Sequence, residues 1–331
     1  FSALLLVGVP VAFSLITSSL LTVLYLGLPS GVVVLQTAAG ASSTSLIAIP
    51  LFVFAGELMM RGGISDRLIA FAAALVGKAR GGLAQINVLA SLFFGGVSGS
   101  AIADVSAIGG TMIPQMVSRG YHRDFAVSAS VSAALVALLV PPSHNLILFS
   151  ASAGGSISIA DLFAAGILPA FLLTAAVMVT SRIIAGRRGY AAEGFPGFGA
   201  LLVRLVAALP GLLLVGMIFF GIRAGIFTAI ESAAIAVCYA TLVTGIVYRR
   251  LDWAVFKEAV TGAARTAGLI LFVIGAAASF GWLLAYLQVP AAAVEMLTSV
   301  TDEKVGILLL LIAILLVLGT FMDLAPLIII C

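Results

Sequence analysis

The chain has 331 residues, of which 63% are hydrophobic and only 9% are charged, and its mean hydropathy is +1.28. Soluble proteins carry about 25% charged residues, so this composition excludes a water-soluble globular protein. The net charge of +3 does not indicate nucleic acid as a partner, and Cys238 and Cys331 lack the spacing of a metal or redox centre.

Apolar runs follow one another along the chain, at residues 1–9, 10–28, 44–60, 83–95, 102–117, 125–153, 160–182, 205–222, 226–248, 266–288, 305–319 and 324–331. Most have the length of a helix that crosses a bilayer, and none shows the short alternating segments of a β-barrel. The runs 83–95 and 102–117 are short, so we expect one hairpin that enters and leaves on the same side. The sequence therefore predicts an all-α polytopic membrane protein with re-entrant helical hairpins.

The positive charges support this topology. If residues 83–117 form such a hairpin and 305–331 begins a second one, only Arg223 and Lys304 among the 16 Lys and Arg residues lie on the opposite side. The positive-inside rule makes the basic side cytoplasmic. An odd number of crossings within 83–117 would remove most of this bias; two full crossings would keep it, but the two runs are short for that.

Two stretches share one order of elements: a membrane helix, an amphipathic segment and a hairpin. They comprise 44–60, 64–78 and the tip 95–100, and then 266–288, 290–299 and a tip near Gly319. By the charge argument the two membrane helices run in opposite directions, which predicts the inverted repeat typical of secondary transporters. The counterpart of the helix that follows the first hairpin would lie beyond Cys331, so we expect a truncated second repeat. We also expect the natural N-terminus to precede Phe1, which lies within an apolar run.

From these features we divide the chain into six segments. They are scaffold helices and the start of repeat 1 (1–60), a cytoplasmic amphipathic segment (61–82), re-entrant hairpin 1 (83–117), a broken helix with the next transmembrane helix (124–186), a linker with scaffold helices (187–265), and the start of repeat 2 with an incomplete hairpin 2 (266–331).

Polar groups fall at membrane depth in three places. The first is the tip of hairpin 1, where glycines break the helix, Ser98 and Ser100 add hydroxyl groups, and Asp104 adds a carboxylate. Free backbone groups in a bilayer are costly, so such a loop is expected to line a cavity or bind a ligand. Tight packing of Gly and Ser is the alternative.

The second place is the segment 140–145, where Pro141 and Pro142 interrupt a long apolar run. The freed carbonyl groups, together with Ser143 and Asn145, are suited to a hard cation such as Na⁺, whereas a simple kink is the alternative. His144 is either a proton carrier or a packing residue. The third place, Gly319 with Thr320 and Asp323, repeats the chemistry of the first tip, unless it is an ordinary extracellular loop.

These positions give two sets of candidates for binding. The candidate cation ligands, for Na⁺ and no other metal, are Ser98, Gly99, Ser100, Asp104, Val140, Pro141, Ser143, Asn145, Gly319, Thr320 and Asp323. The candidate substrate-binding residues are Ser98, Ser100, Ser143, His144, Asn145 and Thr320. No catalytic arrangement, nucleotide loop or zinc spacing is present, and we expect no cofactor.

Two further carboxylates lie in or near apolar helices. Glu57 stands four residues before Arg61, so we expect a local ion pair within one helix. For Glu231, a snorkelling or packing role is at least as good an interpretation as a ligand role.

The chain resembles the large membrane subunit of tripartite ATP-independent periplasmic (TRAP) transporters, the dicarboxylate-transporter M family. The segments that carry the resemblance are 54–59 (FAGELM), 61–64 (RGGI), 80–84 (RGGLA), 87–91 (NVLAS), 98–101 (SGSA) with 103–104 (AD), 166–169 (GILP), 225–228 (GIFT) with Glu231, and 281–282 (GW). They occur in the expected order over essentially the whole chain.

This resemblance implies sodium-coupled import of an organic acid by an elevator mechanism, in a bacterial inner membrane. It implies two protein partners: a small four-helix membrane subunit and a periplasmic substrate-binding protein. One departure is the segment after Pro142, which reads Ser143-His144-Asn145 where many members have Ser-Ile-Pro, so the substrate preference is expected to differ. A stand-alone dicarboxylate–sodium symporter, a passive channel and a membrane-embedded lipid enzyme are the alternative functions.

Overall fold

The computed structural model describes residues 1–79, 81–153, 156–190, 194, 196–300, 303–320, 322 and 324–330. Every regular element in these ranges is helical, which confirms the all-α fold class. The chain folds into two units, one formed by Ile47–Thr266 and the other by Phe1–Leu46 with Ala267–Cys331. Each unit is described by itself.

The larger unit contains the predicted first hairpin and the helices around it. Its elements are α4 (Ala48–Arg61), α5 (Ile64–Val76), α6 (Gly82–Ser98), α7 (Ala101–Asp104), a π-helix (Val105–Gly109), α8 (Gly110–Ser118), α9 (Arg123–Ala134), a 3₁₀ turn (Leu135–Leu138), α10 (His144–Ser152), α11 (Ile159–Arg187), α12 (Phe198–Arg223), α13 (Ala229–Leu242), a second π-helix (Val243–Val247) and the first part of α14 (Trp253–Tyr286).

The smaller unit is formed by both ends of the chain. Its elements are α1 (Ser2–Leu6), α2 (Val11–Tyr25), α3 (Gly31–Ala41), a 3₁₀ turn (Thr44–Ile47) that crosses the unit boundary, the remainder of α14, α15 (Val289–Val300), α16 (Lys304–Gly319) and α17 (Leu324–Ile330). In this unit Gly40 and Gly275 allow α3 and α14 to approach closely, since a Cβ atom at Gly40 would overlap the side chain of Ala278.

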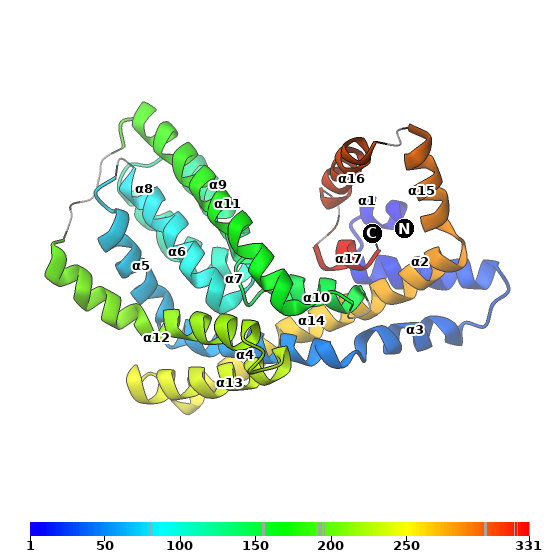
Figure 1. Cartoon of the computed structure of the whole chain (residues 1–331), viewed down its shortest axis with the longest axis horizontal. Helices are drawn as coiled ribbons and strands as arrows, with labels where there is room; N and C mark the ends of the chain where they lie inside the picture. Colours follow the sequence, from blue (N-terminus) through cyan, green and yellow to red (C-terminus); the bar gives the residue numbers. More distant parts are fainter. Residues whose placement is uncertain are drawn as a thin grey trace. The chain divides into compact units, whose positions relative to one another are not determined.

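Helix α6 is the centre of the larger unit. Fourteen of its 17 residues are buried, and it packs against α5, α9, α11 and α12 (Figure 1). The chain then turns at Gly99, and α7, the π-helix and α8 run back along α6. This confirms a helical hairpin at the predicted place; its re-entry into a membrane stays a prediction.

The helix that follows the hairpin is interrupted, as the two prolines predict. Helix α9 tightens into the 3₁₀ turn, residues 139–143 are not helical, and α10 begins at His144. The peptide bond between Pro141 and Pro142 is cis.

Five of the described helical segments are long and apolar enough to cross a membrane: Thr44–Arg61, Ile159–Arg187, Phe198–Arg223, Ala229–Val247 and Trp253–Tyr286. Their outward faces are apolar; on α11, for example, Leu168, Phe171 and Leu172 are between 58% and 67% exposed. Large apolar side chains exposed along a helix of this length are expected where lipid, rather than water, surrounds the protein.

The apolar runs underestimated several helices. Helix α3 lay in no predicted run, α12 begins at Phe198 rather than 205, and α14 begins at Trp253 rather than 266. The early part of α14 carries Lys257, Glu258 and Arg265, which end an apolar run although they favour a helix. An apolar run therefore marks the apolar part of a helix and not its polar extension.

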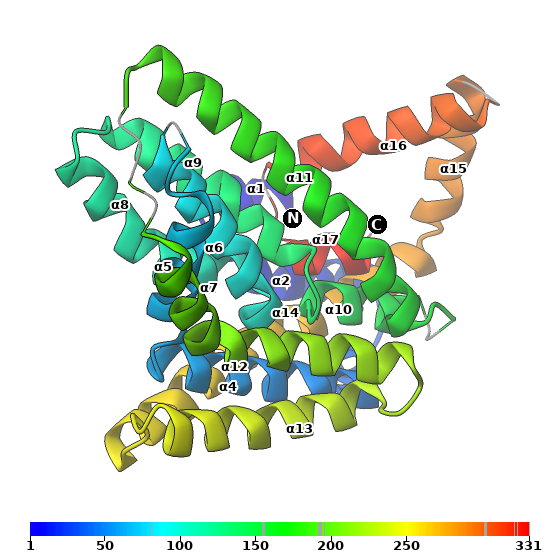
Figure 2. The ribbon, with the colours of Figure 1, turned by 60° about the vertical axis from the view of Figure 1, so that its left-hand side comes forward.

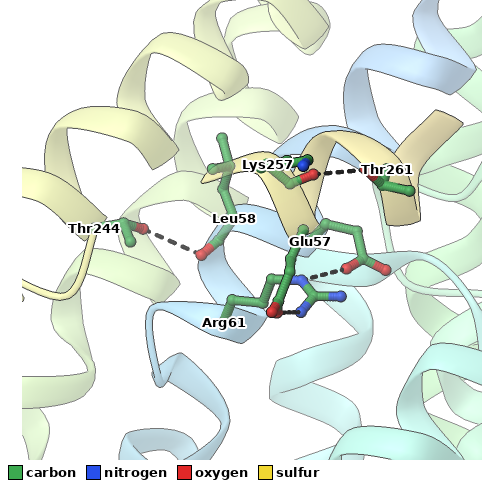
Figure 3. Close-up of polar contacts among 7 residues, drawn as sticks. Glu57, Leu58, Arg61, Thr244, Lys257 and Thr261 are labelled. Atoms are coloured by element: carbon green, nitrogen blue, oxygen red, sulfur yellow. Dashed lines mark hydrogen bonds and ion pairs between the residues drawn. The ribbon is translucent and has the colours of Figure 1, made fainter. Parts of the chain in front are cut away.

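An ion-pair network ties α4 to α14 within the larger unit (Figure 3). The guanidinium of Arg61 lies 3.1 Å (Nε to Oε2) from Glu57 and 2.6 Å (Nη1 to Oε2) from Glu258. The predicted pair of Glu57 with Arg61 is confirmed, and Glu258 is a second partner that sequence spacing did not indicate. Thr244, in the second π-helix, also binds α4: its hydroxyl donates to the carbonyl oxygen of Leu58 at 3.2 Å.

We predict that Arg61→Gln destabilises the protein more than Glu258→Gln. Loss of Arg61 leaves the Glu57 carboxylate, whose side chain is only 18% exposed, without its cation, at a cost of about 1–3 kcal/mol. Loss of Glu258, whose side chain is 64% exposed, removes an outer pair that contributes about 1 kcal/mol or less. Thermal unfolding of the detergent-solubilised protein measures both. Equal effects of the two variants would contradict the assignment of Glu57 as the principal partner.

Candidate functional site

The tip of hairpin 1 is a sharp turn capped by two serines. Gly99 has a left-handed backbone (φ +59°) and its N–H donates to the carbonyl oxygen of Gly95 at 2.8 Å. The hydroxyl oxygen of Ser98 accepts from the N–H of Ser100, and that of Ser100 accepts from the N–H of Ala103, both at 3.4 Å. Ser100 is thus the N-cap of α7, and the two serines stabilise the turn that follows α6.

The break between α9 and α10 leaves backbone carbonyl groups without a hydrogen bond. Among the described residues, no backbone N–H donates to the carbonyl oxygens of Val140, Pro141 or Pro142. The hydroxyl of Ser143 donates to the carbonyl oxygen of Leu138 at 2.7 Å, and Ser143 provides no side-chain cap for α10. The break therefore combines free carbonyl groups with an uncapped helix N-terminus.

The structure brings the hairpin tip and the break together. A Cβ atom on Gly99 would overlap the carbonyl oxygen of Pro142 and lie 3.2 Å from the Cα atom of Ser143. One turn earlier, a Cβ atom on Gly96 would lie 3.3 Å from a methyl group of Val140. The turn at Gly99 and the break at Pro142 and Ser143 thus meet backbone to backbone, whereas the roles of the predicted residues in binding stay predictions.

The other candidates of the break lie beside this contact. Ser143 and Asn145 are buried, whereas His144, the first residue of α10, is half-buried. Helix α10 packs against α11 and α4 (Figure 2).

Asp104 lies away from the tip. Its Oδ2 atom accepts a hydrogen bond from the hydroxyl of Ser91 at 2.7 Å, and the residue is only 1% exposed. Ser91 precedes Ser98 by seven residues, or roughly 10 Å along an α-helix. Asp104 and the tip serines therefore occupy different levels of the hairpin.

The candidates of the second tip belong to the smaller unit. Gly319 and Thr320 are exposed at the end of α16, and the hydroxyl of Thr320 donates to the carbonyl oxygen of Leu316 at 3.0 Å. Asp323 lies outside the described residues. The helix interruption predicted near Gly319 is present, between α16 and α17.

Glu231 has a structural role that the sequence interpretation missed. Its carboxylate accepts from the N–H of Thr228 at 2.7 Å, and its own N–H donates to the hydroxyl oxygen of Thr228 at 3.2 Å. This reciprocal capping box starts α13. The Thr-x-x-Glu spacing before an apolar run is the signal that would have identified it.

The described part of the chain contains no group of three or more His, Cys, Asp or Glu residues that could hold a metal ion. A shallow groove of about 290 Å³ lies between α9 and α11, and it contains none of the candidate residues. We take the contact between the hairpin tip and the break as the candidate site, because two of the predicted places come together there.

Long apolar helices around a hairpin that meets a broken helix define a multi-pass membrane protein. Residues 1–331 match the family model of the tripartite ATP-independent periplasmic transporter, DctM component, and the chain belongs to this family. It is accordingly a transporter permease subunit and not an enzyme, which confirms both expectations from the sequence.

Two relatives named as TRAP transporter large permease proteins agree with this assignment. The chain is 38% identical to the uncharacterised protein YgiK of Salmonella typhimurium, over 100% of this chain and 76% of the relative. It is 34% identical to the sialic acid TRAP transporter large permease protein SiaM of Vibrio cholerae, over 97% of this chain and 75% of the relative. It is 32% identical to the 2,3-diketo-L-gulonate TRAP transporter large permease protein YiaN of Escherichia coli, with the same coverage of 97% and 75%.

The contact at Gly99 predicts a specific intolerance to substitution. Gly99→Ala adds a methyl group against the backbone of Pro142 in a left-handed conformation, which costs about 1–2 kcal/mol before the steric overlap is counted. We expect a lower unfolding temperature. Gly110→Ala is the matched control, because Gly110 lies in the same hairpin with no atom within 4 Å of an added Cβ. A Gly99→Ala protein as stable as the Gly110→Ala protein would contradict the tight tip contact.

Proposed function

We propose that this permease subunit imports an organic acid together with Na⁺, using the site between the tip of hairpin 1 and the interrupted helix. The observation that carries the proposal is the direct backbone contact of Gly99 with Pro142 and Ser143. It brings the carbonyl groups of the break close to the turn that carries Ser98 and Ser100.

Oxygen ligands of this kind suit a sodium ion. Carbonyl groups of unwound helices bind Na⁺ in secondary transporters, where they replace its hydration shell. The Val140, Pro141 and Pro142 carbonyl groups, with the hydroxyl groups of Ser98 and Ser100, are the ligands we assign to it. All of these ligands are neutral. They therefore bind Na⁺ less tightly than a carboxylate would, and the ion can dissociate after it has crossed the membrane.

The same break offers a place for a carboxylate. The side chain of Ser143 does not cap the first backbone N–H groups of α10. These groups can therefore bind an anion, since a helix N-terminus carries partial positive charge. Buried Asn145 adds an amide beside it. A bound Na⁺ at the carbonyl groups and a carboxylate at the amides would partly neutralise each other, which supports co-transport. The substrates in the names of two relatives, sialic acid and 2,3-diketo-L-gulonate, are organic acids.

Membership of the family supports the rest of the proposal. We assign to the chain a small four-helix membrane subunit and a periplasmic substrate-binding protein as partners, and the bacterial inner membrane as location. We also assign an elevator motion to it, in which the re-entrant hairpins carry the site across the membrane. The equal order of helices in α4–α5–α6 and α14–α15–α16 is consistent with two repeats.

Transport by the reconstituted three-part system tests the coupling. Proteoliposomes that contain the full-length permease and the small subunit, supplied with the binding protein, should accumulate a radiolabelled organic acid only with an inward Na⁺ gradient. Sialic acid and 2,3-diketo-L-gulonate are the first acids to try. Equal uptake with an inward K⁺ gradient would reject sodium coupling, and uptake without binding protein would favour a stand-alone symporter.

We predict that Ser98→Ala raises the Na⁺ concentration for half-maximal uptake by about tenfold, which corresponds to about 1.4 kcal/mol of lost ligand binding. Ser106→Ala is the control, because the exposed hydroxyl of Ser106, in the π-helix, donates to the carbonyl oxygen of Ile102 in the preceding turn, α7. An unchanged Na⁺ requirement in Ser98→Ala would remove this hydroxyl from the ion site.

A further inference from the structure

Two arginine side chains converge on the start of α5, away from the candidate site. The first is Arg67, whose Nη1 atom donates to the carbonyl oxygens of Gly62 and Gly63 at 3.2 Å and 2.7 Å. Its guanidinium also lies over the ring of Tyr248, 3.6 Å from the ring centroid. These three contacts hold the guanidinium in one position.

The second is Arg250, which approaches the same glycine. Gly63 has a left-handed backbone (φ +81°), and a Cβ atom there would lie 2.6 Å from Nη1 of Arg250 and 3.2 Å from Nη1 of Arg67. The two Nη1 atoms are therefore within about 6 Å of each other. We call Arg67 and Arg250 the α5 arginine pair.

The α5 arginine pair has no counter-ion within the described ranges. No carboxylate there forms an ion pair with either arginine. The carboxylates closest in sequence belong to Asp66 and Asp252, and that of Asp252 accepts from the N–H of Val255 at 2.7 Å instead. Two like charges at this separation repel each other, so an anion between them would stabilise both.

The start of α5 adds to the positive potential. Gly63 is the N-cap of this 13-residue helix, and no side chain caps it. The first backbone N–H groups of α5 are therefore free to bind an anion, and the helix dipole favours one there. The hydroxyl of Ser65, in the same first turn, is buried without a hydrogen-bond partner among the described residues.

The arginine pair lies where two membrane-spanning segments end. Residues 62–63 directly follow the segment Thr44–Arg61, and residues 248–250 directly follow the segment Ala229–Val247. A group at this level meets the head groups of a bilayer rather than its hydrocarbon core. By the charge argument from the sequence this is the cytoplasmic side, where anionic lipids attract basic residues.

An exposed apolar surface leads up to the pair. Between 56% and 68% of each of three large side chains in the last turns before Tyr248 is exposed: Leu242, Ile246 and Val247. A phospholipid joins a phosphate to acyl chains, so it matches both the arginine pair and this apolar surface. A free phosphate ion would use only the arginine pair.

We propose that the α5 arginine pair binds the phosphate of an anionic phospholipid. The head group lies between the two guanidinium groups and the first turn of α5, and an acyl chain follows the end of α13 and the second π-helix. Because α5 joins α4 to hairpin 1, the bound lipid fixes this connection at the membrane surface. The proposal does not depend on sodium coupling.

Lipid binding by the full-length permease with its small subunit, in non-ionic detergent, tests the proposal. The probe is phosphatidylglycerol with a fluorescent acyl chain, and the measurement is fluorescence anisotropy. We expect saturable binding that unlabelled phosphatidylglycerol displaces, whereas phosphatidylcholine and inorganic phosphate do not. Arg250→Gln should weaken binding about fivefold, the effect of one basic residue at an anionic membrane surface.

Two further variants separate charge from structure. Arg250→Lys keeps the positive charge and should retain most of the affinity. Arg187→Gln removes an exposed arginine at the end of α11, on the same predicted side of the membrane, and should leave the affinity unchanged. Thermal unfolding without lipid verifies that all variants are folded, which we expect for Arg250 because its side chain is exposed.

Four results would overturn the proposal. Equal affinity of Arg250→Gln and the unsubstituted protein would exclude the arginine pair as the binding site. Displacement by phosphatidylcholine would exclude selection by charge, and displacement by inorganic phosphate would identify a site for free anions. Binding to the permease alone that is lost when the small subunit is added would identify a protein interface instead of a lipid site.

Discussion

The contact between the hairpin tip and the interrupted helix exists because residue 99 has no side chain. A turn with a left-handed residue at the end of α6 places Gly99 against the carbonyl group of Pro142, where any Cβ atom would overlap. Two further glycines extend the close approach along α6: a Cβ atom at Gly95 would lie 2.6 Å from the Cα atom of Ala137, and one at Gly96 would meet Val140 and Val215. In a membrane, where helices gain little from the hydrophobic effect, such backbone proximity provides most of the packing.

The same contact affects which backbone carbonyl groups at the break have no hydrogen-bond donor. Pro141 and Pro142 end the helical hydrogen bonds of the preceding segment. At the tip, the N–H groups of Gly99, Ser100 and Ala103 are already bonded to Gly95 and to the two serines. Among the described residues no backbone N–H of the tip donates to the carbonyl groups of the break, and unpaired carbonyl groups within a membrane protein are satisfied by an ion or by water. A break that packed against a regular helix face would have the same free carbonyl groups but none of the hydroxyl oxygens.

The sequence predicted the parts of this arrangement that depend on local chemistry. Paired prolines within an apolar run indicate a break, and a glycine-rich stretch between two short apolar runs indicates a hairpin; both lie where they were predicted. Contacts between distant residues could not be predicted in this way. Asn87, Ser91 and Ser130 look like ordinary helix residues in the sequence, and only the folding of α9 against α6 buries them beside Asp104. Glu258 likewise gains its partner Arg61 only through the packing of α14 on α4.

Helix α6 connects the two polar regions of the hairpin. It carries Ser98 at its tip and both Asn87 and Ser91 about two to three turns earlier, and it is buried along nearly its whole length. A helix packed on so many sides does not deform locally, because interiors of this density transmit displacement rather than absorb it. Asn87 and Ser91 on this helix contact Ser130 and Asp104, so the tip and these polar side chains share one rigid element. The hairpin tip and the polar side chains around Asp104 are thus connected through one closely packed helix.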